Sequence, residues 1–320
     1  MTSILTNSSA MAALSTLRSI SQNMEDTQSH ISSGYRVGEA ADNAAYWSIA
    51  TTMRSDNSAL STVQDALGLG AAKTDTAYTG LNSAIDVVTE IKSKLVAARE
   101  PGVDKLKINS ELTELKNQLV SISESASFSG QNWLYNDSTI ANTTVEMVGS
   151  FNRRSDNTVS VGILTFDTAT STLVDTKNTS LGLLTGDTGV TQPSGTTTAT
   201  ANYFLLDVSG ATAPTGTEIE LAATTSYDNI DGMISAVEVM LSSMTNSAAI
   251  IGSTNMRIDL QNNFVADLMD VIDKGVGRLV DADMNEESTK LKALQTQEQL
   301  GIQALSIANS NAENVLQLFR

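Results

Sequence analysis

The side chains that most often do chemistry are scarce in this chain of 320 residues, which contains no cysteine and one histidine. The lack of cysteine excludes a disulfide framework and cysteine metal sites. The single histidine, His30, excludes most catalytic triads and histidine-rich zinc sites by count. The sequence contains no HExxH motif and no GxxxxGKS or GxxxxGKT loop, so neither a metalloprotease helix nor a phosphate cradle is predicted. We therefore expect no catalysis, no cofactor and no metal site.

One acidic cluster, formed by Asp281, Asp283, Glu286 and Glu287, has the side-chain types of a cation site. Its spacing lacks the glycine and the bidentate glutamate of a calcium-binding loop. Carboxylates are also favoured at the N-terminus of a helix, where they face the positive end of the helix dipole. The cluster is therefore predicted to begin a helix and to be solvated there.

Charge is distributed unevenly along the chain, whose formal net charge is −17. Residues 121–288 carry 6 basic and 21 acidic side chains, so the middle is acidic and both ends are close to neutral. A nucleic-acid-binding surface needs the opposite sign, so no nucleic-acid partner is expected. No run approaches about 18 apolar residues, which predicts no membrane span. Residues 1–10 lack the basic side chains of a signal peptide.

Helical periodicity is strongest at the two ends of the chain. Apolar and small residues recur at alternating steps of three and four between about residues 3 and 33, which predicts one long helix ending at Gly34. The same spacing predicts a last helix over about 285–317, where Gly301 and several alanines allow close backbone approach.

Three further helices and a β-rich segment are predicted between these ends. One helix runs from an N-cap at Asp42 or Asn43 to about residue 98, and the next ends before Ser127. A long helix over about 228–279 has Asn255 and Asn262 in its seam, where polar side chains can fix the register. A β-hairpin is predicted from residues 143–148 and 157–166, and short strands are predicted at 203–208 and 218–222. An irregularity in the long helix is predicted at Gly275 and Gly277.

The sequence thus predicts a mainly α fold: long antiparallel coiled-coil helices from both chain ends, with a β-hairpin and a small β-rich central insert. A single pair of terminal helices covers little apolar surface, so we expect these ends to become ordered when many copies pack together. The alternative is an ordinary four-helix bundle within one chain, because heptads do not reveal whether partner helices share a chain. A stalk-like signalling bundle would need a membrane span, and an enzyme would need convergent catalytic residues.

Two groups of motifs carry a resemblance to a known family. The sequence ISSGYRV at 31–37, followed by ADNAA at 41–45 and IA at 49–50, is similar to the LSSGLRI, AKDDAAG and IA motifs of bacterial flagellins. FSGQN at 128–132 resembles the FNG turn of that family, and the chain ends on NVLQLFR at 314–320. The two similar ends and the dissimilar middle match the flagellin layout. The chain is identified as a member of the family, resembling its alphaproteobacterial, rhizobial branch.

The resemblance implies three structural parts. Residues 1–33 with 285–320 would form an inner-tube domain of terminal helices. Residues 34–178 with 227–284 would form a helical outer-tube domain with the β-hairpin, and 179–226 a variable insert facing solvent. Trp47 and Trp133 would pack inside the outer-tube domain.

The resemblance also implies a function: a secreted structural subunit that polymerises into the flagellar filament used for swimming. A hook–filament junction protein of related layout is the alternative. The implied partners are copies of the chain itself, sister flagellins, an export chaperone on the C-terminal helix, the filament cap and the hook–filament junction proteins. Export would use the flagellar secretion apparatus without a cleaved signal peptide.

The candidate site residues form two sets. The candidate polymerisation residues are apolar side chains of the terminal helices: Leu14, Leu17, Ile20, Met24, Ile31, Leu291, Leu294, Leu305, Val315, Leu316 and Phe319. The resemblance adds subunit contacts at motif positions: Arg36, Asp42, Asn43, Ala44, Ala45 and Ile49.

Overall fold

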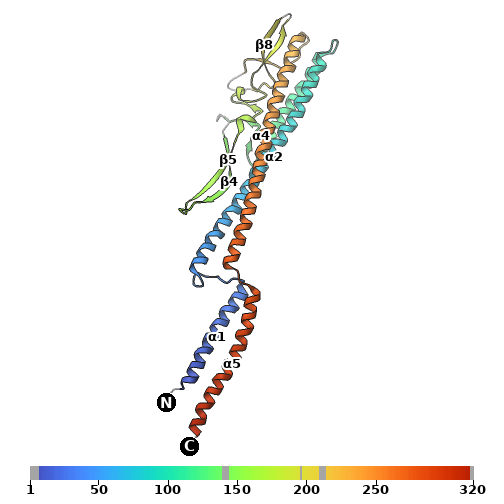
Figure 1. The fold of residues 1–320 in the computed structure, drawn as a ribbon. Helices are drawn as coiled ribbons and strands as arrows, with labels where there is room; N and C mark the ends of the chain where they lie inside the picture. The colour runs from blue at the N-terminus through green and yellow to red at the C-terminus, as the bar shows by residue number, and fades with distance from the viewer. Residues whose placement is uncertain (1–6, 139–143, 195–196, 209–213, 318–320) are drawn as a thin grey trace. The chain divides into compact units, whose positions relative to one another are not determined.

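The computed structural model describes residues 7–138, 144–194, 197–208 and 214–317, and the side chains of α5 as far as residue 310. Five helices carry most of the chain (Figure 1). They are α1 (Ser8–Ser33), α2 (Ala44–Ala98), α3 (Lys105–Ser125), α4 (Tyr227–Val280) and α5 (Met284–Gln317). The strands and short 3-10 helices between α3 and α4 are β1 (Ser127–Phe128), β2 (Gln131–Asn132), β3 (Tyr135–Asn136), β4 (Thr144–Arg153), β5 (Val159–Asp167), η1 (Thr168–Thr170), β6 (Val174–Asp175), η2 (Thr179–Leu181), β7 (Thr188–Ser194), β8 (Thr197–Phe204) and β9 (Thr217–Glu218).

The chain forms two compact units. The terminal unit contains residues 1–58 and 268–320, and the central unit contains residues 59–267. The predicted division into three parts has different boundaries and stays a prediction.

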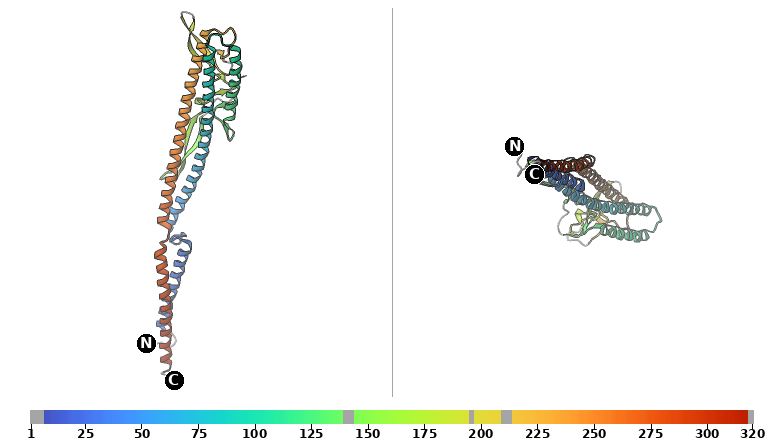
Figure 2. Two further views of the ribbon diagram at one scale, coloured as in Figure 1. Left: turned by 90° about the vertical axis from the view of Figure 1, so that its right-hand side faces the viewer. Right: turned by 90° about the horizontal axis from the view of Figure 1, so that it is seen from below.

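In the terminal unit, α1 and α5 lie side by side (Figures 1 and 2). The Asn7 side chain donates to the carbonyl of Ala308 at 2.9 Å, and at the other end Nδ1 of His30 lies 3.3 Å from Oε1 of Glu287. The start of α1 thus meets the late part of α5, so the helices are antiparallel. The predicted pairing of the chain ends is confirmed.

The ends of α1 are set by two capping residues. The Asn7 side chain accepts a hydrogen bond from the N–H of Ala10 at 3.1 Å, so the helix begins at Ser8. This is later than the predicted start near residue 3, which lies outside the described residues, because Asn7 is a strong N-cap. The predicted end is confirmed: Gly34 adopts φ +77° and donates to the carbonyl of His30, the left-handed C-cap that glycine favours.

The core of the central unit lies between α2, α3 and α4. Its fully buried side chains include Leu67, Leu81, Leu95, Leu112 and Leu119. A polar layer interrupts it, as the asparagines of the seam predict. Nδ2 of Asn255 donates to Asp75 at 2.5 Å, and the hydroxyl of Thr74, itself fully buried, donates to Asn255 at 3.3 Å. These bonds fix one register of α2 against α4.

The predicted β-hairpin is confirmed as β4 paired antiparallel with β5 (Figure 1). The register shifts between Val148 and Ser150, where Gly149 forms a bulge. Met147 of the hairpin packs on Gly70 of α2. Its sulfur lies 3.1 Å from the position that a Cβ atom would take at this glycine. Trp133 is buried as predicted and stacks on Phe166 of β5, with ring centroids 4.6 Å apart.

The strands predicted in the insert are wrong in position. The sheet is β7–β8–β9, and its longest pairing joins residues 188–194 to 197–203. The apolar run of residues 203–206, which suggested a strand over 203–208, is buried, and β8 ends within it at Phe204. Thr- and Ala-rich segments form the ladder because backbone hydrogen bonds need no apolar side chain. The ion pair of Lys116 with Glu218, at 2.7 Å, anchors the sheet to α3.

The long helix α4 continues through Gly275 and Gly277 to Val280, so the predicted irregularity is wrong. One 18-residue window of α4 has a mean hydropathy of 1.3, which by length and composition is sufficient to cross a membrane. A core helix of a soluble protein meets the same criterion. Here Ile230, Met233, Val237 and Met240 of α4 are buried within the central unit.

Two glycines of α2 provide a test of this packing. A Cβ at Gly80 would lie 2.7 Å from Cβ of Ala126 and 2.8 Å from Cδ1 of Leu134. Gly80→Ala should therefore lower the free energy of unfolding by about 1–3 kcal/mol through overpacking. Gly68→Ala is the matched control, because a Cβ there meets nothing within 4 Å. It should raise stability by up to about 1 kcal/mol through helix propensity. Urea unfolding followed by circular dichroism measures both, and equal effects would contradict this description of α2.

Candidate assembly surface of the terminal helices

The connection from α1 to α2 is joined to the connection from α4 to α5 by backbone hydrogen bonds. Tyr35 forms an antiparallel bridge with Asp281, and the N–H of Ala282 donates to the carbonyl of Gly34 at 2.9 Å. The N–H of Arg36 donates to the carbonyl of Val280 at 2.7 Å, and its guanidinium donates to the carbonyl of Leu279 at 3.2 Å. These bonds bring the first motif, residues 31–37, against the end of α4 and the connection that leads into α5.

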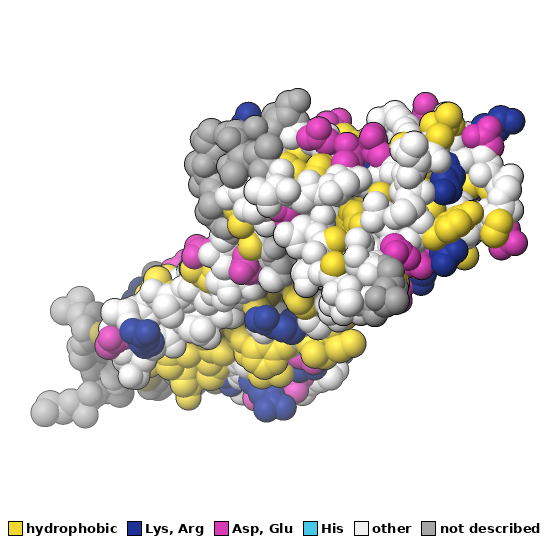
Figure 3. Space-filling model, turned by 90° about the horizontal axis from the view of Figure 1, so that it is seen from above, with side chains coloured by type: hydrophobic (Ala, Val, Ile, Leu, Met, Phe, Trp, Pro, Cys, Tyr) yellow, Lys and Arg dark blue, Asp and Glu magenta, His cyan; other side chains and the backbone are white. Residues whose placement is uncertain are grey.

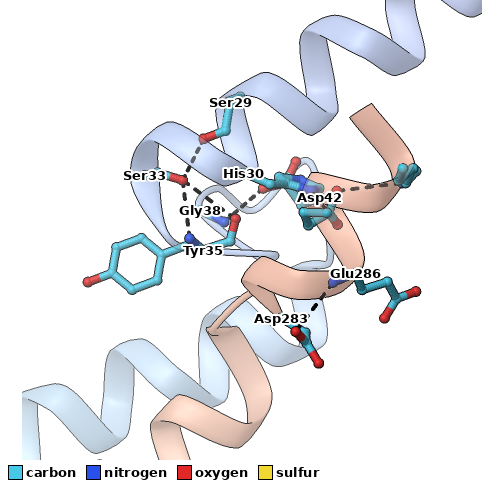
Figure 4. A network of polar contacts seen from close by, with 10 residues as sticks. Ser29, His30, Ser33, Tyr35, Gly38, Asp42, Asp283 and Glu286 are labelled. Atoms are coloured by element: carbon cyan, nitrogen blue, oxygen red, sulfur yellow. Dashed lines mark hydrogen bonds and ion pairs between the residues drawn. The ribbon is translucent and has the colours of Figure 1, made fainter. Parts of the chain in front are cut away.

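Asp42 organises the loop before α2 (Figure 4). One of its carboxylate oxygens accepts from the N–H of Gly38 at 2.8 Å and of Glu39 at 3.0 Å. The hydrogen bond from Glu39, followed by that from Gly38, lowers the pKa of Asp42, and the charge of His30 acts in the same direction. Next to it, Asn43 caps α2 by accepting from the N–H of Tyr46 at 3.1 Å, so Asn43 is the N-cap.

The acidic cluster begins α5, as predicted. Oδ1 of Asp283 accepts from the N–H of Asn285 at 2.9 Å and of Glu286 at 3.4 Å, which makes Asp283 the N-cap (Figure 4). Glu287 is not solvated as expected: it is 8% exposed and faces His30 across the helix pair. Among the described residues, no group of three or more His, Asp and Glu side chains is arranged to hold a metal ion.

The predicted seam residues lie between α1 and α5 of one chain. A Cβ at Gly301 would lie 3.4 Å from Cδ1 of Leu17 and 4.0 Å from Cδ1 of Ile20, so these side chains of α1 cross α5 at its glycine. Thr27 and Leu294 are buried. The other described seam positions are half-buried: Met24, Ile31, Leu291 and Leu305. The side chains of Val315 and Leu316, and the whole of Phe319, lie outside the described residues.

A second set of apolar residues points away from this seam. Leu14 is 40% exposed and Ile302 is 53% exposed, as expected for residues out of register with it. Met11, Leu300 and Ile307, which the sequence analysis did not single out, are exposed by 62–64%. Each of them lies on the side of its helix away from the heptad residues, and this position could have identified them from the sequence. Leu300 and Ile302 are two residues apart and so lie on different sides of α5, which means that the exposed apolar surface extends around the helix pair. Exposed apolar residues that recur along a helix pair mark an interaction surface, and we call the whole exposed surface outside the seam the outer face of the terminal helices.

The remaining motif residues lie at the exposed beginning of α2. Ala44 and Ala45 form its exposed first turn, and Ile49 is 50% exposed. Trp47 is 38% exposed and does not pack inside the fold, so the expectation that it is a core residue is wrong. Helical phase explains this: the buried side of this turn is at Ala50, which packs with Val37, Val276 and Val280.

Long antiparallel helices from both chain ends, with an exposed apolar outer face on the terminal pair, define a structural coiled-coil protein that associates with other molecules. Comparison with known proteins gives its family. Residues 4–139 match the family model of the bacterial flagellin N-terminal helical region, and residues 234–319 match that of the C-terminal helical region.

Relatives match over their full length and that of this chain. Flagellin C of Rhizobium meliloti (strain 1021) is 61% identical over 321 positions, and flagellin A of the same strain is 50% identical over 394 positions. Flagellin of Brucella melitensis biotype 1 is 43% identical over 321 positions. The chain belongs to the bacterial flagellin family: it is a structural subunit of the extracellular flagellar filament, and it polymerises with copies of itself and with sister flagellins. The predicted fold class and function are confirmed, and the hook–filament junction alternative is not favoured.

The role of Asp42 can be tested through pH. Because its pKa is lowered in the folded chain, its carboxylate stabilises the fold above its unfolded pKa of about 3.9, and this contribution is lost as the pH falls through the folded pKa. Asp42→Asn should therefore reduce the stability of the terminal unit at pH 7, by about 1 kcal/mol or less because the side chain is exposed. The difference from wild type should disappear in acid.

Thermal unfolding at several pH values measures this difference. Asp26→Asn is the matched control, since exposed Asp26 on α1 accepts no hydrogen bond from the described residues. A loss of stability in Asp42→Asn that persists unchanged below about pH 3 would show that the carboxylate charge is not the cause.

Proposed function

We propose that the chain enters the filament through the outer face of its terminal helices, while the seam between α1 and α5 holds the two helices together. The observation that carries this proposal is the division of apolar residues between the seam and the exposed surface of the pair. Leu17 and Ile20 pack over Gly301 within the chain, whereas Met11, Leu300 and Ile307 remain more than half exposed. Burying one such side chain completely contributes about 1.5–3 kcal/mol, so a contact repeated along a filament favours assembly.

This proposal divides the candidate polymerisation residues by role. Leu14 belongs to the outer face and would contact neighbouring copies directly. Leu17, Ile20, Met24, Ile31, Leu291, Leu294 and Leu305 would act indirectly, by fixing the position of α1 on α5. Arg36, Asp42 and Asn43 would set the path of the chain between α1 and α2, and Ala44, Ala45 and Ile49 would face neighbours.

The finer assignments are also part of this proposal. Residues 1–33 with 285–320 form the inner tube, 34–178 with 227–284 the outer tube, and 179–226 the insert that faces solvent. The chain has no catalytic role and leaves the cell through the flagellar secretion apparatus without a cleaved signal peptide. The C-terminal helix is bound by an export chaperone beforehand, and the filament cap and the hook–filament junction proteins contact the assembled subunits. The near-neutral charge of both ends and the acidic middle support this arrangement.

A pair of substitutions on α5 tests the division between outer face and seam. Ile302→Glu adds a charge to the outer face, where it is solvated in the monomer but desolvated on assembly. It should leave the helical circular dichroism of the monomer unchanged and prevent filaments in electron micrographs. Leu305→Glu adds the same charge to the half-buried seam, so it should also lower the helix content and the stability of the monomer.

Normal filaments of Ile302→Glu would exclude the outer face as a subunit contact. Lys292→Glu, at an exposed polar position of α5, changes the net charge by about −2 against about −1 for Ile302→Glu, so it is a stringent control for added negative charge and should assemble.

A further inference from the structure

The side chain of Asn7 forms hydrogen bonds with both terminal helices. Its oxygen accepts from the N–H of Ala10 at 3.1 Å and caps α1, and its Nδ2 donates to the carbonyl of Ala308 on α5 at 2.9 Å. A side-chain amide has an acceptor at one end and a donor at the other, and these two partners allow only one assignment of the ends. An aspartate caps a helix equally well but has no hydrogen to donate. The two roles of Asn7 can therefore be separated by one substitution.

The apolar seam holds the start of α1 only weakly. Leu17 is the first large side chain of α1 in the seam; it packs over Gly301 and lies about 15 Å along the helix from Asn7. The seam positions before it are Ala10 and Ala13, whose methyl groups bury little apolar area. Among the described residues, the bond from the Asn7 side chain is the one hydrogen bond that joins the first turns of α1 to α5. This bond therefore fixes the start of α1.

Two exposed apolar side chains lie next to this bond. The N–H of Met11 donates to the backbone carbonyl of Asn7 at 3.0 Å, and Ile307 directly precedes Ala308 in α5. Met11 is 64% exposed and Ile307 is 62% exposed. Exposed hydrophobic side chains also lie between polar ones on the face of the molecule that Figure 3 shows, so exposure alone does not identify a contact. Met11 and Ile307 have in addition a hydrogen bond that holds their two helical turns together.

We propose that Asn7 is a positioning residue for filament assembly: its bond to α5 holds Met11 and Ile307 in the relative placement that a neighbouring copy contacts. This inference rests on the proposed role of the outer face and adds the residue that sets the geometry of that face at the start of α1. Side chains that are already in place bind more tightly, because ordering them on binding costs free energy. A chain whose α1 has detached must first restore the bond, so the apparent affinity falls with the attached fraction.

The substitution Asn7→Asp removes the donor and keeps the cap. The helical circular dichroism of the monomer should be unchanged, and the critical concentration for assembly should rise about three- to tenfold, the factor that one hydrogen bond contributes. Asn7→Ala removes the cap as well, so it should show the same assembly defect together with a lower helix content. If Asn7 acted only as a cap, Asn7→Asp would assemble like the wild type.

Asn23→Asp is the matched control for the added charge. Asn23 is exposed on α1, and its side chain forms no hydrogen bond with the described residues. This variant should assemble like the wild type.

Spin labels measure the placement of α1 directly in the monomer, since the chain contains no cysteine. Ser9→Cys with Gln295→Cys labels the start of α1 and an exposed position of α5. The distance distribution, measured by double electron–electron resonance, should be narrow when Asn7 is present and broader in Asn7→Asp. Gln22→Cys with Gln303→Cys, both exposed and nearer the middle of the pair, is the control and should stay narrow in both.

An unchanged critical concentration in Asn7→Asp, or an unchanged distance distribution at its labelled start of α1, would overturn the positioning role. A distribution that is already broad in the labelled chain with Asn7 would overturn it as well. Failure of the wild-type chain to form filaments would instead overturn the proposed function. The distances are measured in the monomer, so they test the bond from Asn7 to α5 independently of polymerisation.

Discussion

The packing of α1 against α5 is the constraint on which the rest of the terminal unit depends. These helices come from opposite ends of the chain, and they are held together by a narrow seam in which Leu17 and Ile20 cross Gly301. The glycine lets the two backbones approach closely, which two large side chains at this crossing would prevent. The seam uses one side of each helix, so the other sides are left exposed to solvent. The same geometry that joins the chain ends therefore creates the outer face.

Hydrogen bonds where α1 ends and α5 begins fix the paths of the two connecting segments. The loop after Gly34 is bonded to residues 279–282, and Asp42, Asn43 and Asp283 each satisfy backbone N–H groups at the start of a helix or the loop before it. The motif residues thus have a structural reason for their types. A glycine provides the left-handed cap that ends α1, and short polar side chains cap the loop and the beginning of α2. The family motif therefore specifies the connection between α1 and α2 and its contact with the connection between α4 and α5.

The sequence predicted those features that depend on local rules. The heptad steps of α1, α4 and α5, the Gly34 cap and the β-hairpin arise from periodicity and capping, and the structure has all of them. It did not predict what tertiary packing decides. The strands β7 and β8 consist largely of threonine and small residues and pair through their backbones, so their hydropathy carried no signal. Gly275 and Gly277 were expected to disturb α4, but a helix packed along its length tolerates such residues.

Side-chain roles were predicted less completely than elements. Heptad positions identified the side chains of the seam but could not say that the partner helix belongs to the same chain. Trp47 was expected to pack inside the outer-tube domain, yet helical phase directs Ala50 inward instead. His30 gave no signal in the sequence, since its partner Glu287 is distant along the chain and meets it only when the ends are paired.

Assembly through the outer face requires that this face becomes buried in the filament, while the seam is already packed and at least half-buried in the monomer. Hydroxyl-radical footprinting of two methionines of α1 tests it most directly, because Met11 lies on the outer face and Met24 lies in the seam. Met11 should be oxidised rapidly in the monomer and strongly protected in the filament, and Met24 should be oxidised slowly in both. Equal oxidation of Met11 in monomer and filament would contradict it.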